Sequence, residues 1–282
     1  MYTLIVENER GEQLTLTNCD VCDVLRVDGL NPPPATINVS ESANIDGSAF
    51  KSSRISLRNI VILLNVKSPI EANRQQLYKY FRSKRWCRLY YKNDSRDVYI
   101  DGYVETFEND QFTNLQKPQI SIICPKVFFK NRIDNTVEFS GTTDLFEFPF
   151  SIADEGAEMG VIEKVVTRLI DAGEVETGAV ISLIAGSDQI LNPTIYNRTT
   201  QAYFGLNVDM NEGDEITIST IKGEKAVTLL RNGVATNIID KMSDGSTWLL
   251  FEPGVNEISY GAAVGESNLI VSLKITQLFE GV

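Results

Sequence analysis

The sequence predicts a mainly β chain of two domains, with a single α-helix in the first domain. In the second half, short apolar runs are separated by turn residues at a spacing of roughly ten, which is typical of a two-sheet β-sandwich. In the first half, one segment has the start signals of a helix. The length of 282 residues exceeds the roughly 100–200 residues of one domain, so two domains are expected.

The distribution of charge supports this division. Residues 1–130 contain 17 Lys and Arg against 15 Asp and Glu, a net +2, whereas residues 131–282 contain 9 against 23, a net −14. We therefore expect an N-terminal domain over residues 1–135, a linker over residues 136–162 and a C-terminal sandwich over residues 163–282.

The chain begins with a predicted hairpin and a further strand. Tyr2–Val6 and Leu14–Thr17 flank the turn Glu9–Gly11, and Cys22–Val27 leads into the turn signal Asp28–Gly29.

An extended segment follows. Three consecutive prolines, Pro32–Pro34, favour an open path of the backbone. Ala35–Ser42 predicts a strand or an extended arm, and the small polar residues of Ser40–Ser53 predict a long loop. Arg54–Val66 then predicts a strand, and because both of its faces become apolar we expect burial on both sides.

A helix is predicted after this strand. Ser68, Pro69 and Glu71 match a capping box, with proline at the first helical position where its missing N–H costs nothing. The face predicted to be buried carries Ile70, Leu77 and Phe81, with Arg74 inside the stripe.

The helix ends in a basic cluster of Arg82, Lys84 and Arg85. A nucleic-acid patch is one interpretation of this cluster. A solvated helix end is the favoured one, because cations are routinely placed at the negative end of the helix dipole.

Three aromatic-rich strands are predicted next, over Trp86–Lys92, Asp97–Phe107 and Gln119–Cys124. Their tyrosines suit cross-strand packing. A base-stacking platform is the alternative, but it requires a basic groove. Because acidic residues such as Asp101 and Glu105 are interleaved, packing is favoured.

In the linker, Leu145–Phe150 is predicted to be an aromatic strand and Asp154–Gly160 an exposed loop. The second half is predicted to contain nine strands: Glu163–Asp171, Ala179–Ala185, Ile190–Tyr196, Ala202–Val208, Glu215–Thr220, Ala226–Leu230, Thr247–Phe251, Asn256–Tyr260 and Leu269–Gln277.

Composition argues against several classes of function. The chain contains no histidine, which removes the commonest general base and the commonest metal ligand. We therefore expect no enzyme, no catalytic residue, no metal and no cofactor. The acidic second half would repel phosphates, which disfavours nucleic-acid binding. No apolar run approaches the roughly 18 residues of a membrane-spanning helix, and Met1–Asn8 lacks the pattern of a signal peptide, so we expect synthesis in the cytoplasm and no membrane partner.

The four cysteines are candidate metal ligands. Cys19 and Cys22 have the spacing of half a zinc site, but neither a second close pair nor a histidine completes the four ligands. Cys87 and Cys124 lie in predicted strands. Four reduced and mostly buried thiols are therefore expected.

Two further candidates for chemistry are weak. Acidic pairs such as Asp154 with Glu155 and Glu174 with Glu176 would suit glycoside hydrolysis only at a suitable separation, and as neighbours of glycines they are predicted to be exposed turn residues. Trp248 is predicted to pack in the sandwich core, and stacking on a sugar ring is the alternative.

Taken in order, short motifs along nearly the whole chain resemble the siphophage distal tail protein (Dit) family. One departure is Ala172–Glu174, where the family more often has Asn-Pro-Gly-Asp. The matching segments are Asp28–Leu30, Ile45–Gly47, Arg58–Ile60, Glu71–Leu77, Asp101–Glu105, Ile120–Pro125, Glu147–Phe150, Gly173–Gly178, Asn192–Asn197, Gly213–Ile218, Asn232–Gly233 and Ser246–Asn256.

The resemblance implies an architecture and a set of partners. It implies a homohexameric ring made by the N-terminal domain, with a channel that passes DNA, and a C-terminal, galectin-like β-sandwich that faces outward. The ring would join the tail tube protein to the tail-associated tip protein, and receptor-binding or other baseplate proteins would attach to it. The location implied is the tail tip of the virion, assembled in the cytoplasm of the host bacterium. The extended segment Asn31–Ser53 would wrap a neighbouring subunit.

Two alternatives stay open beside this structural role. The first is a carbohydrate-binding protein that uses the C-terminal sandwich for attachment to the host cell surface. The second, a glycosidase, is disfavoured by the residues described above.

Overall fold

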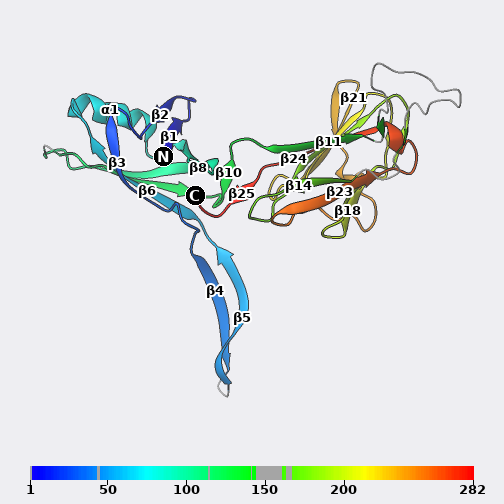
Figure 1. Ribbon diagram of the computed structural model, residues 1–282, viewed down its shortest axis with the longest axis horizontal. Coiled ribbons are helices and arrows are strands. Elements are labelled where there is room, and N and C mark those ends of the chain that lie inside the picture. The colour runs from blue at the N-terminus through cyan, green and yellow to red at the C-terminus, as the bar shows by residue number, and fades with distance from the viewer. Residues whose placement is uncertain (1, 43–44, 114, 141, 144–160, 163–166) are drawn as a thin grey trace, which may run out of the picture. The chain divides into compact units, whose positions relative to one another are not determined.

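The computed structural model describes residues 2–42, 45–113, 115–140, 142–143, 161–162 and 167–282. The chain forms two compact units (Figure 1). The first contains Met1–Arg132 together with the C-terminal Phe279–Val282, and the second contains Ile133–Leu278. Both are built mainly of β-strands, as the sequence predicts. No helix in the described ranges is long and apolar enough to cross a membrane.

A nine-stranded sheet is the main element of the first unit. Its strand order is β2-β1-β7-β8-β9-β6-β3, with β10 paired to β8 and β25 paired to β10, and the neighbours along the main order are antiparallel. The strands are β1 Thr3–Asn8, β2 Gln13–Thr15, β3 Cys22–Asp28, β6 Arg58–Val66, β7 Trp86–Lys92, β8 Asp97–Glu108, β9 Gln119–Cys124, β10 Phe129–Asn131 and β25 Leu278–Phe279.

The core of the first unit lies on one face of this sheet. Along β6, Ile60, Ile62 and Leu64 are fully buried, whereas the intervening Val61 and Leu63 are only half-buried. The expectation that this strand is buried on both sides is therefore wrong, because only one of its faces meets the core. The predicted strand Arg54–Val66 is also interrupted, since one strand ends at Ile55 and β6 begins at Arg58.

The helix α1, Ile70–Tyr80, packs on the buried face of the sheet. Leu77 and Phe81 enter the core and Arg74 is buried beside them, which confirms the predicted face. The capping box is wrong: the Ser68–Pro69 bond is cis, Pro69 is the N-cap, and no side chain caps the helix. The carboxylate of Glu71 instead accepts a hydrogen bond from Arg74, at 2.5 Å, so it does not reach back to the helix start.

The segment predicted to be a loop over Ser40–Ser53 is instead strand. β4, Ala35–Ser42, and β5, Ile45–Ile55, pair antiparallel as a separate two-stranded sheet that we call the arm. Figure 1 shows the arm as a long ribbon outside the nine-stranded sheet. The alternative of an extended arm for Ala35–Ser42 is thus the one that the structure adopts.

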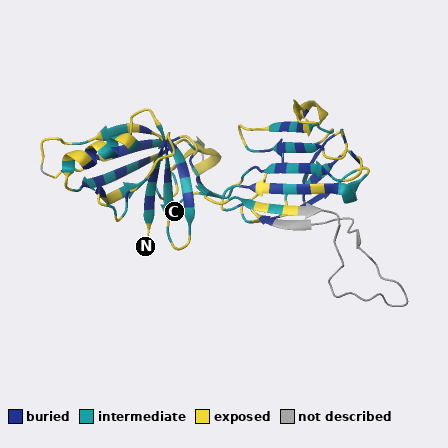
Figure 2. Ribbon diagram, turned by 90° about the horizontal axis from the view of Figure 1, so that it is seen from above, coloured by how far each residue is buried: buried dark blue, intermediate teal, exposed yellow. Residues whose placement is uncertain are grey.

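The second unit contains two larger sheets that share one core. The first has the order β11-β24-β15-β20-β21-β22 and the second the order β14-β23-β17-β18. Buried residues alternate with more exposed ones along their strands (Figure 2), as expected where one face of each sheet meets the core. The strands are β11 Asn135–Ser140, β14 Thr167–Asp171, β15 Val180–Ala185, β17 Thr194–Asn197, β18 Ala202–Gly205, β20 Glu215–Ser219, β21 Ala226–Arg231, β22 Val234–Asn237, β23 Val255–Gly261 and β24 Leu269–Ile275.

Shorter elements complete this unit. They are the strand pairs β12 Thr142–Thr143 with β13 Val161–Ile162, and β16 Ile190–Leu191 with β19 Asp209–Met210, and the two 3-10 turns Ile239–Lys241 and Glu266–Asn268.

Some predicted elements of the second half are wrong in detail. Thr247–Phe251 is not a strand, because Phe251 makes only an isolated bridge to Thr177. Ile190–Tyr196 is divided at Asn192–Pro193. Residues at the start of the predicted linker form β11, which pairs with β24.

The predicted strand Leu145–Phe150 and the predicted loop Asp154–Gly160 lie outside the described residues. The galectin-like character of the sandwich stays a prediction.

Candidate assembly surfaces

The arm presents apolar side chains that its own subunit does not cover. Val39 and Phe50 are directly paired across the two strands, and Ile37 lies two residues before Val39 on the same face. Their exposed fractions are 61% for Ile37, 50% for Val39 and 66% for Phe50. The strands β4 and β5 pack chiefly against each other. A two-stranded ribbon with one apolar face is marginal alone in water, so this face is suited to a partner.

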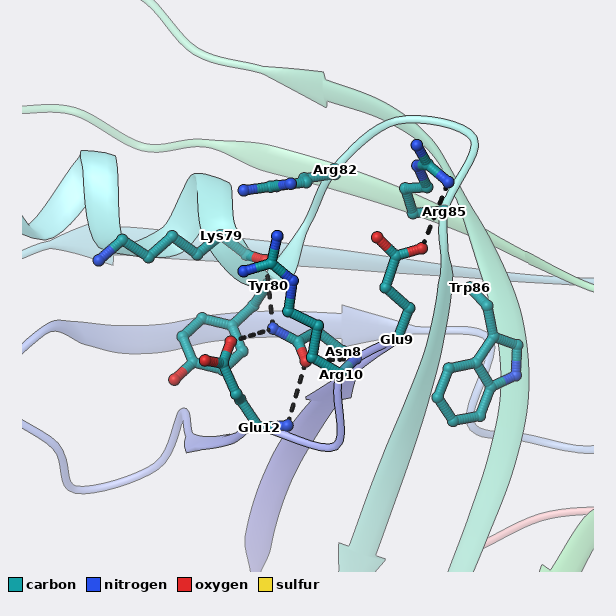
Figure 3. A pocket seen from close by; sticks show the side chains of 9 residues that line it. All are labelled: Asn8, Glu9, Arg10, Glu12, Lys79, Tyr80, Arg82, Arg85 and Trp86. Atoms are coloured by element: carbon teal, nitrogen blue, oxygen red, sulfur yellow. Dashed lines mark hydrogen bonds and ion pairs between the residues drawn. The ribbon is translucent and has the colours of Figure 1, made fainter.

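A small cleft lies at the C-terminal end of α1 (Figure 3), with a volume of about 190 Å³. Its lining comes from the β1–β2 turn, the end of α1 and the start of β7. The buried Asn8 organises the turn: its Oδ1 accepts hydrogen bonds from the backbone N–H of Arg10 and Glu12, and its Nδ2 donates to Glu12 Oε2 at 2.7 Å. Sequence reasoning had not singled out this asparagine.

The cleft carries a net positive charge. Its lining contains four cations, Lys79, Arg82, Arg85 and Arg10, and two carboxylates, Glu9 and Glu12, a balance of +2. Arg85 lies 3.5 Å from Glu9. The structure thus brings together two members of the predicted basic cluster, Arg82 and Arg85, whereas Lys84 does not line the cleft. A site of this size and charge suits one carboxylate or phosphate group rather than a strand of nucleic acid.

The aromatic strands form a packed network around Arg88. Its guanidinium lies 4.3 Å from the ring centroid of Tyr99 and 5.3 Å from that of Trp86, and its Nε donates to Asp101 at 2.7 Å. Burial alone would lower the pKa of Arg88, but its hydrogen bonds with Asp101 and Tyr90 and the nearby charge of Asp101 together outweigh burial and raise the pKa above the ordinary value. Because the charge of Arg88 is paired with the carboxylate of Asp101, the strands offer no free cation here for a nucleic-acid phosphate. This supports the packing interpretation over a base-stacking platform.

The cysteines lie in the first unit as free thiols. Cys19 Sγ and Cys22 Sγ are 3.8 Å apart. In the described part of the chain, no group of three or more metal-ligating side chains surrounds them or any other point. Burial raises the pKa of Cys22, and it raises the pKa of Cys87 and of Cys124 to about 12, so these three thiols are held in the protonated form.

The remaining sequence candidates lie apart in the second unit. Trp248 is half-buried and packs on the core, with its ring centroid 5.3 Å from that of Phe204. This is the core role that the sequence favoured. Glu174 and Glu176 are exposed, and the pair Asp154 and Glu155 lies outside the described residues.

Two family models match successive parts of the chain. Residues 11–124 match the phage tail protein RIFT-related domain, and residues 172–274 match the C-terminal domain of the siphovirus-type tail component. These matches fall in the first and second units respectively. No curated protein sequence matches the chain.

Solved structures support the same assignment at the level of fold. The Dit protein of phage SPP1, described as a paradigm of the hub adsorption apparatus in phages that infect Gram-positive hosts, is similar over 99% of each chain, with 12% identity and a TM-score of 0.68. A chain of the phage P2 baseplate in its activated conformation is similar over 100% of each chain, with 12% identity and a TM-score of 0.57. With both tail domains present in this order and the fold shared over the whole length, the chain belongs to the siphophage distal tail (Dit) protein family.

Proposed function

We propose that this chain is the structural hub of the distal tail, or baseplate, of a long-tailed phage with a non-contractile tail. The observation that carries the proposal is the pair of tail-protein domains, one in each unit. In this role the first unit assembles a homohexameric ring at the virion tail tip, formed in the host cytoplasm. The ring joins the tail tube protein to the tail-associated tip protein, and its outer sandwich anchors receptor-binding and other baseplate proteins.

The arm supports assembly through the first unit. Its apolar face, made by Ile37, Val39 and Phe50, is exposed in the single chain. A neighbouring subunit that covered this face would remove apolar area from water, which favours association. This assigns to the arm the wrapping role that the resemblance implies for Asn31–Ser53.

The charge of the first half suits a conduit. With a net charge of +2 over residues 1–130, a ring of these domains has little electrostatic attraction for the phosphates of passing DNA. DNA is therefore a transient occupant of the channel and not a bound partner, and no catalysis is assigned to the chain.

The test is the absolute mass and shape of the purified full-length protein, measured by light scattering and negative-stain imaging. A ring of six subunits is expected. A protein that stays monomeric at high concentration, and also in a mixture with its tail tube and tip proteins, would overturn the hub assignment.

The carbohydrate-binding alternative loses its first candidate residue. Trp248 packs on the core, so its ring is not a free platform for a sugar. Any saccharide site on the sandwich must therefore use other side chains.

A further inference from the structure

The connection between β2 and β3 places two thiols side by side. Cys19 lies in this connection, and Cys22 is the first residue of β3. Their sulfur atoms are 3.8 Å apart. Both thiols donate towards the main-chain oxygen of Leu16, which lies 3.6 Å from Cys19 Sγ and 3.8 Å from Cys22 Sγ. The two side chains therefore point to the same side of the turn, and a sulfur–sulfur bond of about 2.05 Å needs mainly side-chain rotation.

The main chain of this turn is held by the residues that follow β6. Lys67 Nζ donates to the main-chain oxygen of Cys19 at 2.7 Å, and the Lys67 N–H donates to that of Val21 at 3.0 Å. Asn73 Nδ2, from α1, donates to the main-chain oxygen of Asp20 at 3.2 Å. The two thiols are thus presented to each other by a fixed scaffold, which favours a bond between them over a bond to another molecule.

The two thiols differ in their access to solvent. Cys22 is fully buried, whereas Cys19 is half-buried. The backbone N–H of Cys22 donates to Cys19 Sγ at 3.4 Å, and a hydrogen bond of this kind stabilises a thiolate at its acceptor. Cys19 is therefore suited to react first with a reagent from solvent, and Cys22 is placed to react with Cys19.

The other two cysteines are too far apart for such a bond. Cys87 of β7 and Cys124 of β9 lie on strands on either side of β8. Because neighbouring strands are about 4.8 Å apart, the Cα atoms of Cys87 and Cys124 are separated by at least about 9 Å. A disulfide spans no more than about 7 Å between Cα atoms, so this pair is an internal control.

We propose that Cys19 and Cys22 form a reversible intramolecular disulfide when the protein meets an oxidising medium, and that this bond locks the turn before β3. Thiols stay reduced in the cytoplasm, whereas disulfides persist outside the cell. In the virion of the proposed function the bond would form after release from the host. The chemistry itself does not depend on that function.

A low-molecular-weight disulfide such as oxidised glutathione is the oxidant. The Cys19 thiolate attacks one glutathione sulfur, so that a mixed disulfide forms, and the first glutathione leaves with the proton that Cys19 gave up. The Cys22 sulfur then attacks the Cys19 sulfur. The mixed disulfide breaks, and the second glutathione leaves with the proton of Cys22. The protein loses two electrons and two protons, and two molecules of reduced glutathione are formed.

The buried position of Cys22 makes the second step the slower one. Burial above all raises the pKa of Cys22, and the neighbouring sulfur of Cys19 adds to this effect. In the mixed disulfide Cys19 carries neither a charge nor an S–H, so this second cause is removed. The attack needs no access to solvent, because the two sulfurs are already 3.8 Å apart.

The test is the mass of the full-length protein before and after incubation with excess oxidised glutathione at about pH 8, without denaturant. The parent should lose about 2 Da and regain it with dithiothreitol. After alkylation of the remaining thiols, the change should map to the tryptic peptide of residues 11–26, which contains both cysteines. The melting temperature of the oxidised form should lie about 2–5 °C above that of the reduced form.

Three variants assign the steps. Cys22→Ser should stop at the mixed disulfide, with one glutathione attached to Cys19. Cys19→Ser should not react at this site, because Cys22 is buried. Cys87→Ala is the matched control, since it removes a thiol of the same unit that is not in the pair, and it should form the bond as the parent does. Thermal unfolding checks that each variant is folded, and peptide mapping of the parent decides alone if a serine variant is not.

Several results would overturn the proposal. They are a parent peptide that keeps both thiols, a reaction that stops at the mixed disulfide, a bond that links two chains, and a bond that forms only in urea. An oxidised form that melts no higher than the reduced form would overturn the locking of the turn. Ring formation is measured separately by light scattering, so failure of the disulfide and failure of the hub assignment can be told apart.

Discussion

Arg58 donates a hydrogen bond from Nη2 to the main-chain oxygen of Glu280, at 2.5 Å and across 222 positions of the chain. The same buried side chain donates to the main-chain oxygens of Val127 at 2.7 Å, Asn31 at 2.8 Å and Gly29. Its guanidinium also lies 4.6 Å from the ring centroid of Phe129. All four of these bonds go to main-chain carbonyl oxygens. Through them Arg58 joins the C-terminal residues to the segment that leads into the arm.

The first prediction is that Arg58→Leu destabilises the first unit by about 3–5 kcal/mol. Removing the guanidinium leaves four main-chain oxygens without this donor, one in a buried bond and three in partly buried bonds. Each unsatisfied buried group costs about 1–3 kcal/mol, and the partly buried ones cost less. Urea unfolding of the full-length protein measures the change. Arg26→Leu is the control, because the side chains of Arg26 and of its partner Asp28 are both largely exposed, so this substitution should change the free energy of unfolding by less than about 0.5 kcal/mol. Equal effects of the two substitutions would contradict the role of Arg58.

The second prediction concerns the arm. Phe50→Asp should prevent ring formation while leaving the melting temperature of the subunit nearly unchanged, because the side chain is 66% exposed in the single chain. A carboxylate at this position would have to be desolvated in any contact that covers the apolar face. Light scattering measures the assembly state, and thermal unfolding measures the fold.

The matched control for the arm is Thr36→Asp. It adds the same charge to β4 but on the opposite face, since Thr36 precedes Ile37 by one residue. Rings are expected from Thr36→Asp and not from Phe50→Asp. If both variants form rings, the apolar face of the arm is not the assembly contact.

The sequence predicts well the elements whose signals are local. The strands β7 and β9 have the same bounds as their predictions, and α1 has the predicted buried face. The second strand of the arm, Ile45–Ile55, was missed because its residues are small and polar, and it is held by its register with β4 rather than by a buried face. The helix cap was predicted wrongly because Glu71 has a competing partner, Arg74, one turn later.

The strand register of the four-stranded sheet in the second unit could not be predicted from spacing. Thr194, Gly205 and Gly261 come from three strands, and only the register of β17 with β18 and β23 brings them together. Thr194 and Gly261 are 67 positions apart in the sequence. No local pattern in the sequence records this pairing.

The third prediction is a loss of stability at alkaline pH through buried thiols. Burial raises the pKa of Cys87 and of Cys124 to about 12, whereas an unfolded thiol has a pKa of about 8.5. The folded state therefore holds its protons in a range where the unfolded state loses them. The contribution of each protonated thiol to stability is fully present below about pH 8.5 and is lost as the pH rises towards 12. Over this range the free energy of unfolding falls by up to about 1.4 kcal/mol per pH unit for each thiol.

Cys87→Ala tests this dependence. The variant should be less stable than the parent at pH 8, and the difference should narrow as the pH rises to about 11, since the parent alone carries this thiol. Val98→Ala is the control, because it removes a buried apolar side chain that does not titrate, so its cost should not vary with pH. A constant difference for Cys87→Ala would contradict the assignment of a raised thiol pKa.

The fourth prediction concerns Asp214 in the second unit. Its side chain is 4% exposed and accepts hydrogen bonds from Arg231 Nη2 at 2.6 Å and from the backbone N–H of Asn211 at 2.7 Å. The bond from Arg231 holds the pKa of Asp214 below its usual range. Asp214→Asn should lower the free energy of unfolding at pH 7 by about 1–2 kcal/mol, a modest value because the side chain of Arg231 is 39% exposed and solvent screens the pair.

The pH dependence of Asp214→Asn follows from the sign of this shift. A carboxyl group whose pKa is lower in the folded state stabilises the fold at pH values above the unfolded pKa of about 3.9, and loses that contribution as the pH falls through the folded value. The difference between Asp214→Asn and the parent should therefore be constant above about pH 5 and shrink below about pH 4, as followed by urea unfolding. Asp240→Asn provides the comparison, because Asp240 and its partner Lys241 are both exposed, and this variant should match the parent throughout. If the cost of Asp214→Asn persists unchanged at the lowest pH at which the protein is folded, the carboxylate charge is not what stabilises this turn.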